Sequence, residues 1–136
     1  MNFYVINLFH LSAVELCKYI LEQGYQVYGV GINQLENFTT FEEDLWMAFG
    51  RNANFSYVHA DVFLVQKEIK QDAEIFYFPF QQEVRNEHFL SVFNQLENLI
   101  YYVQDNPSED VQKLCPSINF LTDDEEFLKK FFLERI

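Results

Sequence analysis

The stretch FYVINLFHLSAVELCKYILEQGYQVYGVG, Phe3–Gly31, decides the fold of this chain. Its first part, Phe3–Leu8, is an almost continuous apolar run, which is typical of a central strand with helices on both faces. Ser12 opens a capping box, and apolar residues recur on one helical face until Gly24, which predicts a helix with a left-handed C-terminal stop. Tyr25–Val30 follows at once and is rich in β-formers, so the stretch predicts a right-handed strand–helix–strand unit with parallel strands.

The alternation of strands and helices continues to the middle of the chain. Overlapping capping boxes predict a second helix over about residues 39–50. A third strand is predicted over Phe55–Ala60, a weaker helix over about Phe63–Gln71, and a fourth strand over Glu74–Phe78. This order is typical of an α/β domain with a parallel sheet.

The longest predicted helix runs over Asn86–Gln104. Its apolar residues recur at spacings of four and three, and further apolar side chains widen this face. The stripe consists of Phe89, Phe93, Leu96, Ile100 and Val103, and Leu90, Leu99 and Tyr102 lie beside it. A helix that packs only on a sheet needs a single stripe, so the extra width predicts a two-fold homodimer through the helix 86–104, with another protein as a further possible partner.

The last part of the chain predicts one more strand and one more helix. Ser117–Leu121 is the predicted fifth strand, and Thr122 is the predicted cap of a final amphipathic helix. The whole of residues 1–136 is therefore predicted to form a single three-layer α/β domain. Its mainly parallel five-stranded sheet is expected in the order 3-2-1-4-5, because right-handed crossovers from a central first strand lead there.

Composition and charge exclude several classes of function. The formal net charge of −12 disfavours binding to nucleic acids, whose affinity comes largely from Lys and Arg. No apolar run approaches the roughly 20 residues that span a bilayer, so we expect no membrane partner and a cytoplasmic location. Cys17 is predicted to be a buried, inert thiol and Cys115 a more exposed one, and neither the cysteines nor any His/Asp/Glu cluster predicts a metal site.

Two stretches carry a resemblance to a known family. KYILEQGYQVYGV at Lys18–Val30 and FSYVHADV at Phe55–Val62 are similar to sequences of the extended short-chain dehydrogenase/reductase family, the NAD-dependent epimerases and dehydratases. The resemblance covers roughly Phe3–Leu121, which corresponds to the N-terminal Rossmann half of that family. It implies a Rossmann-like fold, and it also implies pairing of subunits through the helix equivalent to residues 86–104.

The dinucleotide-binding turn of that family, G-x-x-G-x-x-G after the first strand, is altered in this chain. By spacing to the glycine that ends the first helix, its three positions fall on Asn7, His10 and Ala13. Ala13 is a tolerable replacement, and Asn7 can adopt a left-handed conformation. Leu8, Phe9 and His10, however, are expected to bring bulk to the place of the diphosphate. A ligand role for His10, as a donor to an anion, is the alternative to a merely solvated histidine.

Two further positions of the family's nucleotide site are also changed or ambiguous. The acid that bonds the ribose hydroxyls falls on Gly31, so that contact is missing. Asp61 stands where the family often contacts adenine, although a carboxylate at this place more often caps the next helix. Asn7, His10, Ala13, Gly31 and Asp61 together are the predicted remains of a cofactor-binding cleft.

The catalytic residues of the family are not found in the sequence. That family uses a Tyr-x-x-x-Lys pair, and no tyrosine of this chain has a lysine four residues later. We therefore predict a protein that is not an enzyme and has no cofactor. It would be a catalytically inactive Rossmann-like protein that acts through protein–protein interaction or self-association. The alternative is a sensor that binds NAD(P) or another nucleotide through an altered phosphate loop.

Overall fold

The computed structural model describes residues 1–8, 10–32, 49, 51–65 and 68–136, which contain six strands and five helices. The strands are β1 (Asn2–Ile6), β2 (Gln26–Gly31), β3 (Phe55–His59), β4 (Glu74–Tyr77), β5 (Ile100–Val103) and β6 (Asn119–Leu121). The helices are α1 (Leu11–Glu22), α3 (Ala60–Val65), α4 (Glu83–Phe93), α5 (Glu109–Leu114) and α6 (Glu125–Arg135).

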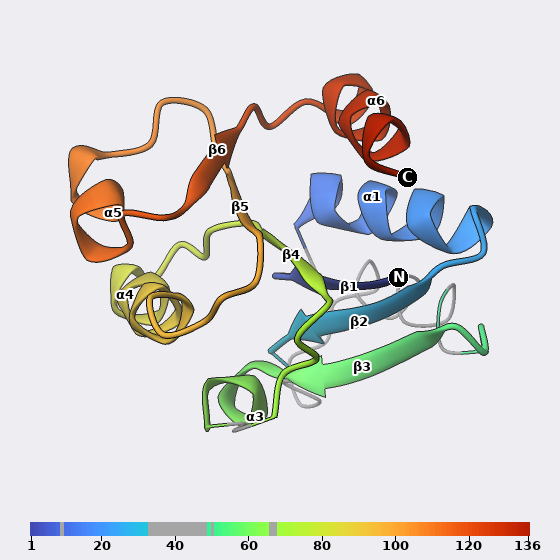
Figure 1. Ribbon diagram of the computed structural model, residues 1–136, viewed down its shortest axis with the longest axis horizontal. Coiled ribbons are helices and arrows are strands. Elements are labelled where there is room, and N and C mark those ends of the chain that lie inside the picture. Colours follow the sequence, from blue (N-terminus) through green and yellow to red (C-terminus); the bar gives the residue numbers. More distant parts are fainter. Residues whose placement is uncertain (9, 33–48, 50, 66–67) are drawn as a thin grey trace.

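All six strands form one parallel sheet in the order β3-β2-β1-β4-β5-β6. The predicted α/β class and the predicted order 3-2-1-4-5 are confirmed, with one strand more: β5 was not predicted and lies between β4 and the predicted strand over 117–121, which is β6. α1 and α6 cover one face of the sheet, and α3, α4 and α5 cover the other (Figure 1). The fold therefore has the three layers that the alternation of elements predicts.

β1 is the central strand because both of its faces are apolar. Phe3 and Val5 pack under α1 and α6, whereas Tyr4 and Ile6 pack on the α3 and α4 side. β1 pairs with β2 on one side and with β4 on the other. A continuous apolar run is what a parallel strand that is buried on both faces requires.

The ends of α1 agree only in part with the prediction. Gly24 has a positive φ of 85° and its N–H donates to the carbonyl of Leu21 at 3.0 Å, which confirms the left-handed stop. The predicted cap at Ser12 is wrong, because α1 already begins at Leu11. His10 is the N-cap residue, and no side chain caps this end of the helix.

The predicted helix over 86–104 is wrong. Only its first part, up to Phe93, is helical, since α4 runs over Glu83–Phe93 and β5 begins at Ile100. The turn between them is held by Asn98, whose Nδ2 donates to the carbonyls of Lys70 and Ala73 at 2.9 Å each. Apolar residues of a helix, a turn and a strand thus mimicked one helical stripe.

β5 forms because its partner strand lies next to it in space. Its four residues IYYV are all buried, and Ile100 pairs with Ile75 of β4. A short apolar run without periodicity is compatible with either a buried strand or a helix. The run forms a strand here because the edge of β4 offers it unpaired backbone groups. The dimer predicted through 86–104 loses the helix face from which it was argued, because Leu90 and Tyr102 are buried within the protomer.

Other predicted details are corrected at the C-terminal end. Asp124, not Thr122, caps α6, because its carboxylate accepts a hydrogen bond from the N–H of Phe127 at 2.8 Å. The strand over 117–121 is β6 rather than the fifth strand. Cys115 is fully buried, contrary to the prediction, and Cys17 is buried as expected. Burial raises the pKa of the Cys17 thiol to about 12, which makes it unreactive.

One predicted helix is shorter than expected, and another lies almost entirely outside the described residues. The helix predicted over 63–71 is the short α3, Ala60–Val65. The helix predicted over 39–50 lies outside the described residues, apart from the buried Phe49. No helix in the described ranges is both long and apolar enough to cross a bilayer.

Candidate functional site

The carboxyl ends of the strands form the edge of the sheet where a site is expected. From β1 the chain order runs outward to β2 and β3 on one side and to β4, β5 and β6 on the other. β1 and β4 are therefore neighbours at the point where the strand order reverses. Ligands of open α/β sheets bind outside the carboxyl ends of the strands at such a point.

The turn between β1 and α1 lies at this point and has a defined backbone shape. Asn7 has a positive φ of 73°, so it takes the left-handed conformation that its sequence position allows. The N–H groups of Asn7 and Leu8 both donate to the carbonyl of Val30, at 2.8 and 2.9 Å. Asn7 Nδ2 also donates to the carbonyl of Pro79 at 3.0 Å. These bonds tie the turn to β2 and to the segment after β4.

We expected the Leu8 side chain to fill the place of a diphosphate at the carboxyl ends of β1 and β4, and this expectation is wrong. Its side chain is buried in the core under α1, beside Gly29 of β2. A Cβ at Gly29 would lie 3.1 Å from Leu8 Cδ2 and 2.7 Å from the ring of Phe55, so the glycine makes room for these side chains. Phe9 lies outside the described residues.

The N-terminus of α1 points at the crevice without a side-chain cap. The first turn contains no acidic residue, and its first N–H groups have no partner within the helix. Ala13 lies in this turn and is fully buried, so the helix packs closely on the sheet there. An uncapped helix N-terminus carries a partial positive charge and free donors, both of which favour an anion.

His10 joins this turn to the last loop of the sheet. Its ring lies on Phe78, with centroids 5.2 Å apart, and its Nε2 lies 3.5 Å from Asp123 Oδ2. The side chains of both residues are partly exposed, yet His10 Nδ1 and Asp123 Oδ1 are buried and have no hydrogen-bond partner in the described part of the chain. The pair therefore keeps unused polar atoms at the crevice.

The other two predicted residues lie farther along the same edge. Gly31 ends β2 and is paired with His59 of β3. Asp61 lies in the first turn of α3, where its exposed carboxylate accepts a hydrogen bond from Arg85 at 3.3 Å. This bond is to α4 and not to the start of α3, so the favoured interpretation of Asp61 as a simple cap is not what its contacts show.

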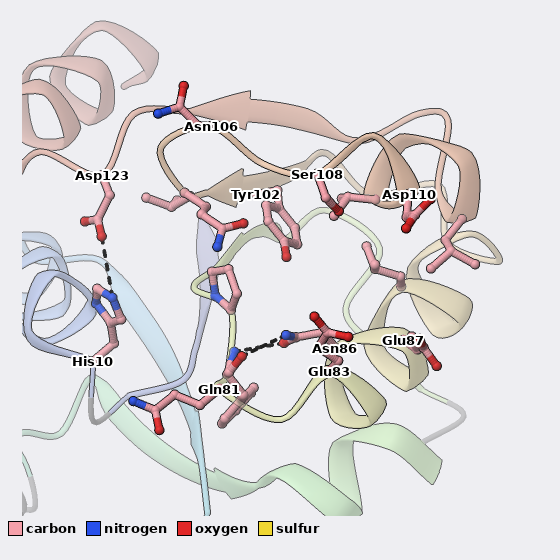
Figure 2. Close-up of a pocket in the computed structure, with 17 residues that line it drawn as sticks. His10, Gln81, Glu83, Asn86, Glu87, Tyr102, Asn106, Ser108, Asp110 and Asp123 are labelled. Atoms are coloured by element: carbon pink, nitrogen blue, oxygen red, sulfur yellow. Dashed lines mark hydrogen bonds and ion pairs between the residues drawn. The ribbon is translucent and has the colours of Figure 1, made fainter.

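A cavity of about 640 Å³ opens on the β4 and β5 side of the edge, between α4 and α5. Pro79 and Phe80 after β4 and Tyr102 and Val103 of β5 are among the residues that line it. Figure 2 shows side chains of α4 and α5 facing each other across it, with the His10–Asp123 pair at one end. Its volume lies in the range of pockets that hold small molecules.

Tyr102 is the polar group at the floor of the cavity. The residue is 2% exposed, and its hydroxyl points into the cavity (Figure 2). This hydroxyl makes no hydrogen bond to any described residue, whereas that of neighbouring Tyr77 donates to Asn86 Oδ1. Burial, and then the nearby Glu83 carboxylate, raise the pKa of Tyr102 to about 12, so the hydroxyl keeps its proton at neutral pH.

Asn86 fixes the loop at one side of the cavity. Its Oδ1 accepts from the N–H of Phe80 and its Nδ2 donates to the carbonyl of Phe80, both at 2.8 Å. The Asn86 side chain therefore makes the same pair of hydrogen bonds to the backbone of Phe80 that a neighbouring strand would make. Its Oδ1 also accepts a hydrogen bond from the Tyr77 hydroxyl. Three of its four hydrogen-bonding positions are thus used, two on Oδ1 and one on Nδ2, so Asn86 mainly positions the loop.

The lining of the cavity is strongly acidic. The carboxylates are Glu83 and Glu87 on α4, Asp110 on α5, and Asp123 after β6. No lysine or arginine is among the described lining residues, and Asp123 alone has a basic neighbour, His10. The described residues also contain no group of three or more His, Cys, Asp or Glu side chains that could hold a metal ion.

Sequence reasoning found one half of this edge and missed the other. The predicted residues cluster at β1, β2 and β3, and of these only His10 lines the cavity. Tyr102 and the acids of α4 and α5 were missed because Ile100–Val103 was assigned to a helix. The β-rich run IYYV before Asp105 was the signal that would have placed Tyr102 at the carboxyl end of a strand.

Comparison with known proteins finds one informative likeness. No family model matches the chain, and no curated protein matches it. Among solved structures, the chain is similar to yeast methylglyoxal/isovaleraldehyde reductase Gre2 complexed with NADPH. The TM-score is 0.54 at 16% sequence identity, and the match covers 99% of this chain and 53% of that chain. The chain thus spans about half the length of this reductase.

This likeness corrects our prediction that the chain has no cofactor. A protein of the same fold was solved with NADPH bound, so the altered turn is not sufficient ground for excluding a nucleotide. The family resemblance in the sequence and the structural likeness point to the same class of protein, because the similar structure is a reductase with NADPH. The likeness itself shows that the chain has a Rossmann-like α/β fold.

Proposed function

We propose that this chain is a Rossmann-like domain that binds a nucleotide such as NAD(P) through an altered phosphate-binding turn, and that it lacks reductase chemistry. The observation that carries the proposal is the β1–α1 turn. Asn7 is left-handed, Leu8 is turned into the core, and α1 begins without a cap or an acid. The turn therefore offers backbone donors at the switch point of the sheet, where ligands of open α/β sheets bind.

The charge of the protein does not oppose this proposal. A phosphate at the α1 N-terminus would be held by N–H groups and by the helix dipole, which need no lysine or arginine. His10, as the N-cap residue, stands at the same place and has an unused Nδ1. The acidic side chains of α4 and α5 lie instead on the far side of β4.

The proposed loss of reductase chemistry rests on the missing pair of catalytic residues. No tyrosine of the chain is followed by a lysine at the fourth position, and α5, the element after β5, has only six residues. A proton donor for carbonyl reduction is thus not provided in the arrangement that the resembling family uses. We expect no oxidation of NADPH with methylglyoxal or isovaleraldehyde, as followed by the absorbance of the cofactor.

Binding is tested by the thermal shift that nucleotides produce. At a hundred times its dissociation constant, NADPH should add about 2.7 kcal/mol to the free energy of unfolding. Leu11 is the first residue of α1 and is 62% exposed. Leu11→Glu places a carboxylate that the helix dipole favours, by about 0.3–1 kcal/mol, but that repels a phosphate. The variant should therefore keep its stability without ligand and bind NADPH at least roughly tenfold more weakly.

Leu99→Glu is the matched control for this variant. It makes the same change of charge at an exposed leucine just before β5, at the amino edge of the sheet. Its shift with NADPH should equal that of the unmodified protein. The proposal fails if NADPH, NADP⁺, NADH, NAD⁺, ATP and a nucleotide sugar all leave the melting temperature unchanged, or if Leu11→Glu responds as the unmodified protein does.

Self-association through the edge of the sheet is a second candidate function. β6 pairs only with β5 among the described strands, so its outer edge presents unpaired backbone groups. Phe120 of this strand is 37% exposed. Unpaired backbone groups at a sheet edge can form a template for pairing with a second chain, although β6 has only three residues. This surface replaces the helix 86–104 in our prediction of a homodimer.

The self-association is tested by sedimentation velocity at tens of micromolar protein. We expect a dimer for the unmodified protein and a monomer for Phe120→Lys, since a charged side chain on an edge strand prevents pairing. Phe127→Lys is the control at another exposed phenylalanine, on α6, and should remain dimeric. A monomeric unmodified protein would end this second candidate and leave nucleotide binding untouched.

A further inference from the structure

We infer that the cavity between α4 and α5 binds a small aliphatic amine, whose ammonium group is held by the acidic side chains and by the Tyr102 hydroxyl. The cavity opens on the α4 and α5 side of the sheet, and only its far end, at His10 and Asp123, reaches the turn that we assign to a nucleotide. The inference goes beyond nucleotide binding, because the chemistry of this cavity is opposite to that of a phosphate site.

The charge of the lining is the first argument. Glu83, Glu87 and Asp110 face one cavity, and no described lysine or arginine lines it to balance them. Arg85 of α4 is paired with Asp61 at 3.3 Å and lies over the ring of Phe80, 5.7 Å from its centroid, but does not itself line the cavity. Carboxylates in a partly closed space raise the local concentration of a cation and disfavour an anion. A phosphate or carboxylate ligand would have to enter against this field.

Tyr102 is the second and independent argument. The Tyr102 hydroxyl is not sealed in the core, because it opens to the cavity, where it can bond water or a ligand. Tyr102 is buried on every side except the one that faces the cavity, and there it meets no described partner (Figure 2). Its oxygen can accept a hydrogen bond from an ammonium N–H. The donor that this hydroxyl lacks in the protein is thus the one that an amine brings.

The floor of the cavity suits the carbon chain of such a ligand. Leu90 and Val111 are buried residues of the core on this face and present apolar surface beside the acidic side chains. Small-molecule sites typically combine an apolar wall with a few polar groups that fix orientation. An alkyl chain with a terminal ammonium matches both parts, whereas a bare metal cation would leave the apolar floor unused.

Isothermal titration calorimetry with putrescine and spermidine tests the inference, with succinate as an anionic probe. We expect saturable binding of the amines at one site and none of succinate. Tyr102→Phe removes one hydroxyl without changing charge or shape, so it should weaken putrescine binding about two- to tenfold. Its far-ultraviolet spectrum and NADPH response should stay those of the unmodified protein. Equal affinity of Tyr102→Phe and the unmodified protein would overturn the role of the hydroxyl.

Charge variants separate the cavity from general attraction to an acidic protein. Glu83→Gln/Glu87→Gln should weaken putrescine binding at least roughly tenfold. Glu97→Gln/Glu126→Gln removes the same charge from exposed positions outside the cavity and should have little effect. Equal losses in both pairs, or no amine binding at all, would overturn the inference. Tighter binding of Nα-acetyl-lysine methylamide than of either amine would overturn it in favour of a lysine side chain of another protein.

Discussion

Arg135→Met should destabilise the protein by about 3 kcal/mol, because it leaves a buried carboxylate without its partner. Glu74 is the first residue of β4 and is 5% exposed. Its Oε1 accepts hydrogen bonds from Arg135 Nε at 2.7 Å and from the other guanidinium nitrogen Nη2, and the hydroxyl of Tyr101 lies 3.4 Å away. Glu74 Oε2 is buried without a partner, so Arg135 is the main compensation for the charge.

The Arg135 contact also docks α6 on the sheet. The guanidinium lies over the ring of Tyr101, 5.7 Å from its centroid. The hydrogen bond to Glu74 raises the pKa of Arg135 further above its ordinary value, so the residue stays charged at every pH at which the protein folds. Because the Arg135 side chain is about one third exposed, the expected loss lies at the lower end of the range for buried ion pairs.

Thermal unfolding measures this effect. For a domain of this size, the loss corresponds to a melting temperature lower by roughly 10–15 °C. Lys130→Met is the control, since it removes a charge from an exposed position of the same helix. The double variant Glu74→Gln/Arg135→Met should recover part of the stability, because the buried charge is then gone. A melting temperature of Arg135→Met equal to that of Lys130→Met would contradict the prediction.

Phe76→Ala should cost about 3–5 kcal/mol, the largest loss that we expect from a single substitution. Phe76 lies in β4, is fully buried and belongs to the core beneath α1 and α6. Its ring stacks on Tyr101 with centroids 5.1 Å apart and has Phe3 and Phe131 at 6.3 and 6.4 Å. Truncation removes these contacts and leaves a cavity between the sheet and α6, which strands on either side prevent from collapsing.

Urea unfolding compares this variant with Phe127→Ala. Phe127 is on α6 and is 41% exposed, so its truncation should cost less than about 1 kcal/mol. Phe76→Leu keeps most of the volume and should fall between the two. If Phe76→Ala and Phe127→Ala shift the urea midpoint equally, the assignment of Phe76 to the centre of this core is wrong.

Local signals were sufficient for the first half of the fold. The apolar run of β1, the glycine that ends α1 and the immediate return into β2 are features of neighbouring residues, and a right-handed crossover then leaves few topologies. The same holds for the left-handed Asn7, because few other residue types adopt that conformation. Fold class and the order of the first four strands were therefore predictable from one sequence.

The candidate site was only half predictable, since it depends on contacts between distant segments. Whether Ile100–Val103 is a helix or a strand is decided by the free edge of β4, about twenty-five residues earlier in the chain. Whether Leu8 blocks the crevice is decided by the space above Gly29. Neither fact is visible in the spacing of neighbouring residues.

The sequence alone determined the parallel strand–helix–strand unit, the central place of β1 and the altered residues of the phosphate turn, because these follow from local periodicity and from the φ that a residue type allows. Only the tertiary structure decided that Tyr102 lies in a strand, one residue before its carboxyl end, that its hydroxyl lacks a described partner, and that acids of α4 and α5 line one cavity. The physical reason is that the burial of a side chain and the electrostatic field of a cavity depend on segments that strand pairing brings together. When these segments are far apart in the chain, the spacing of neighbouring residues does not indicate that they pair.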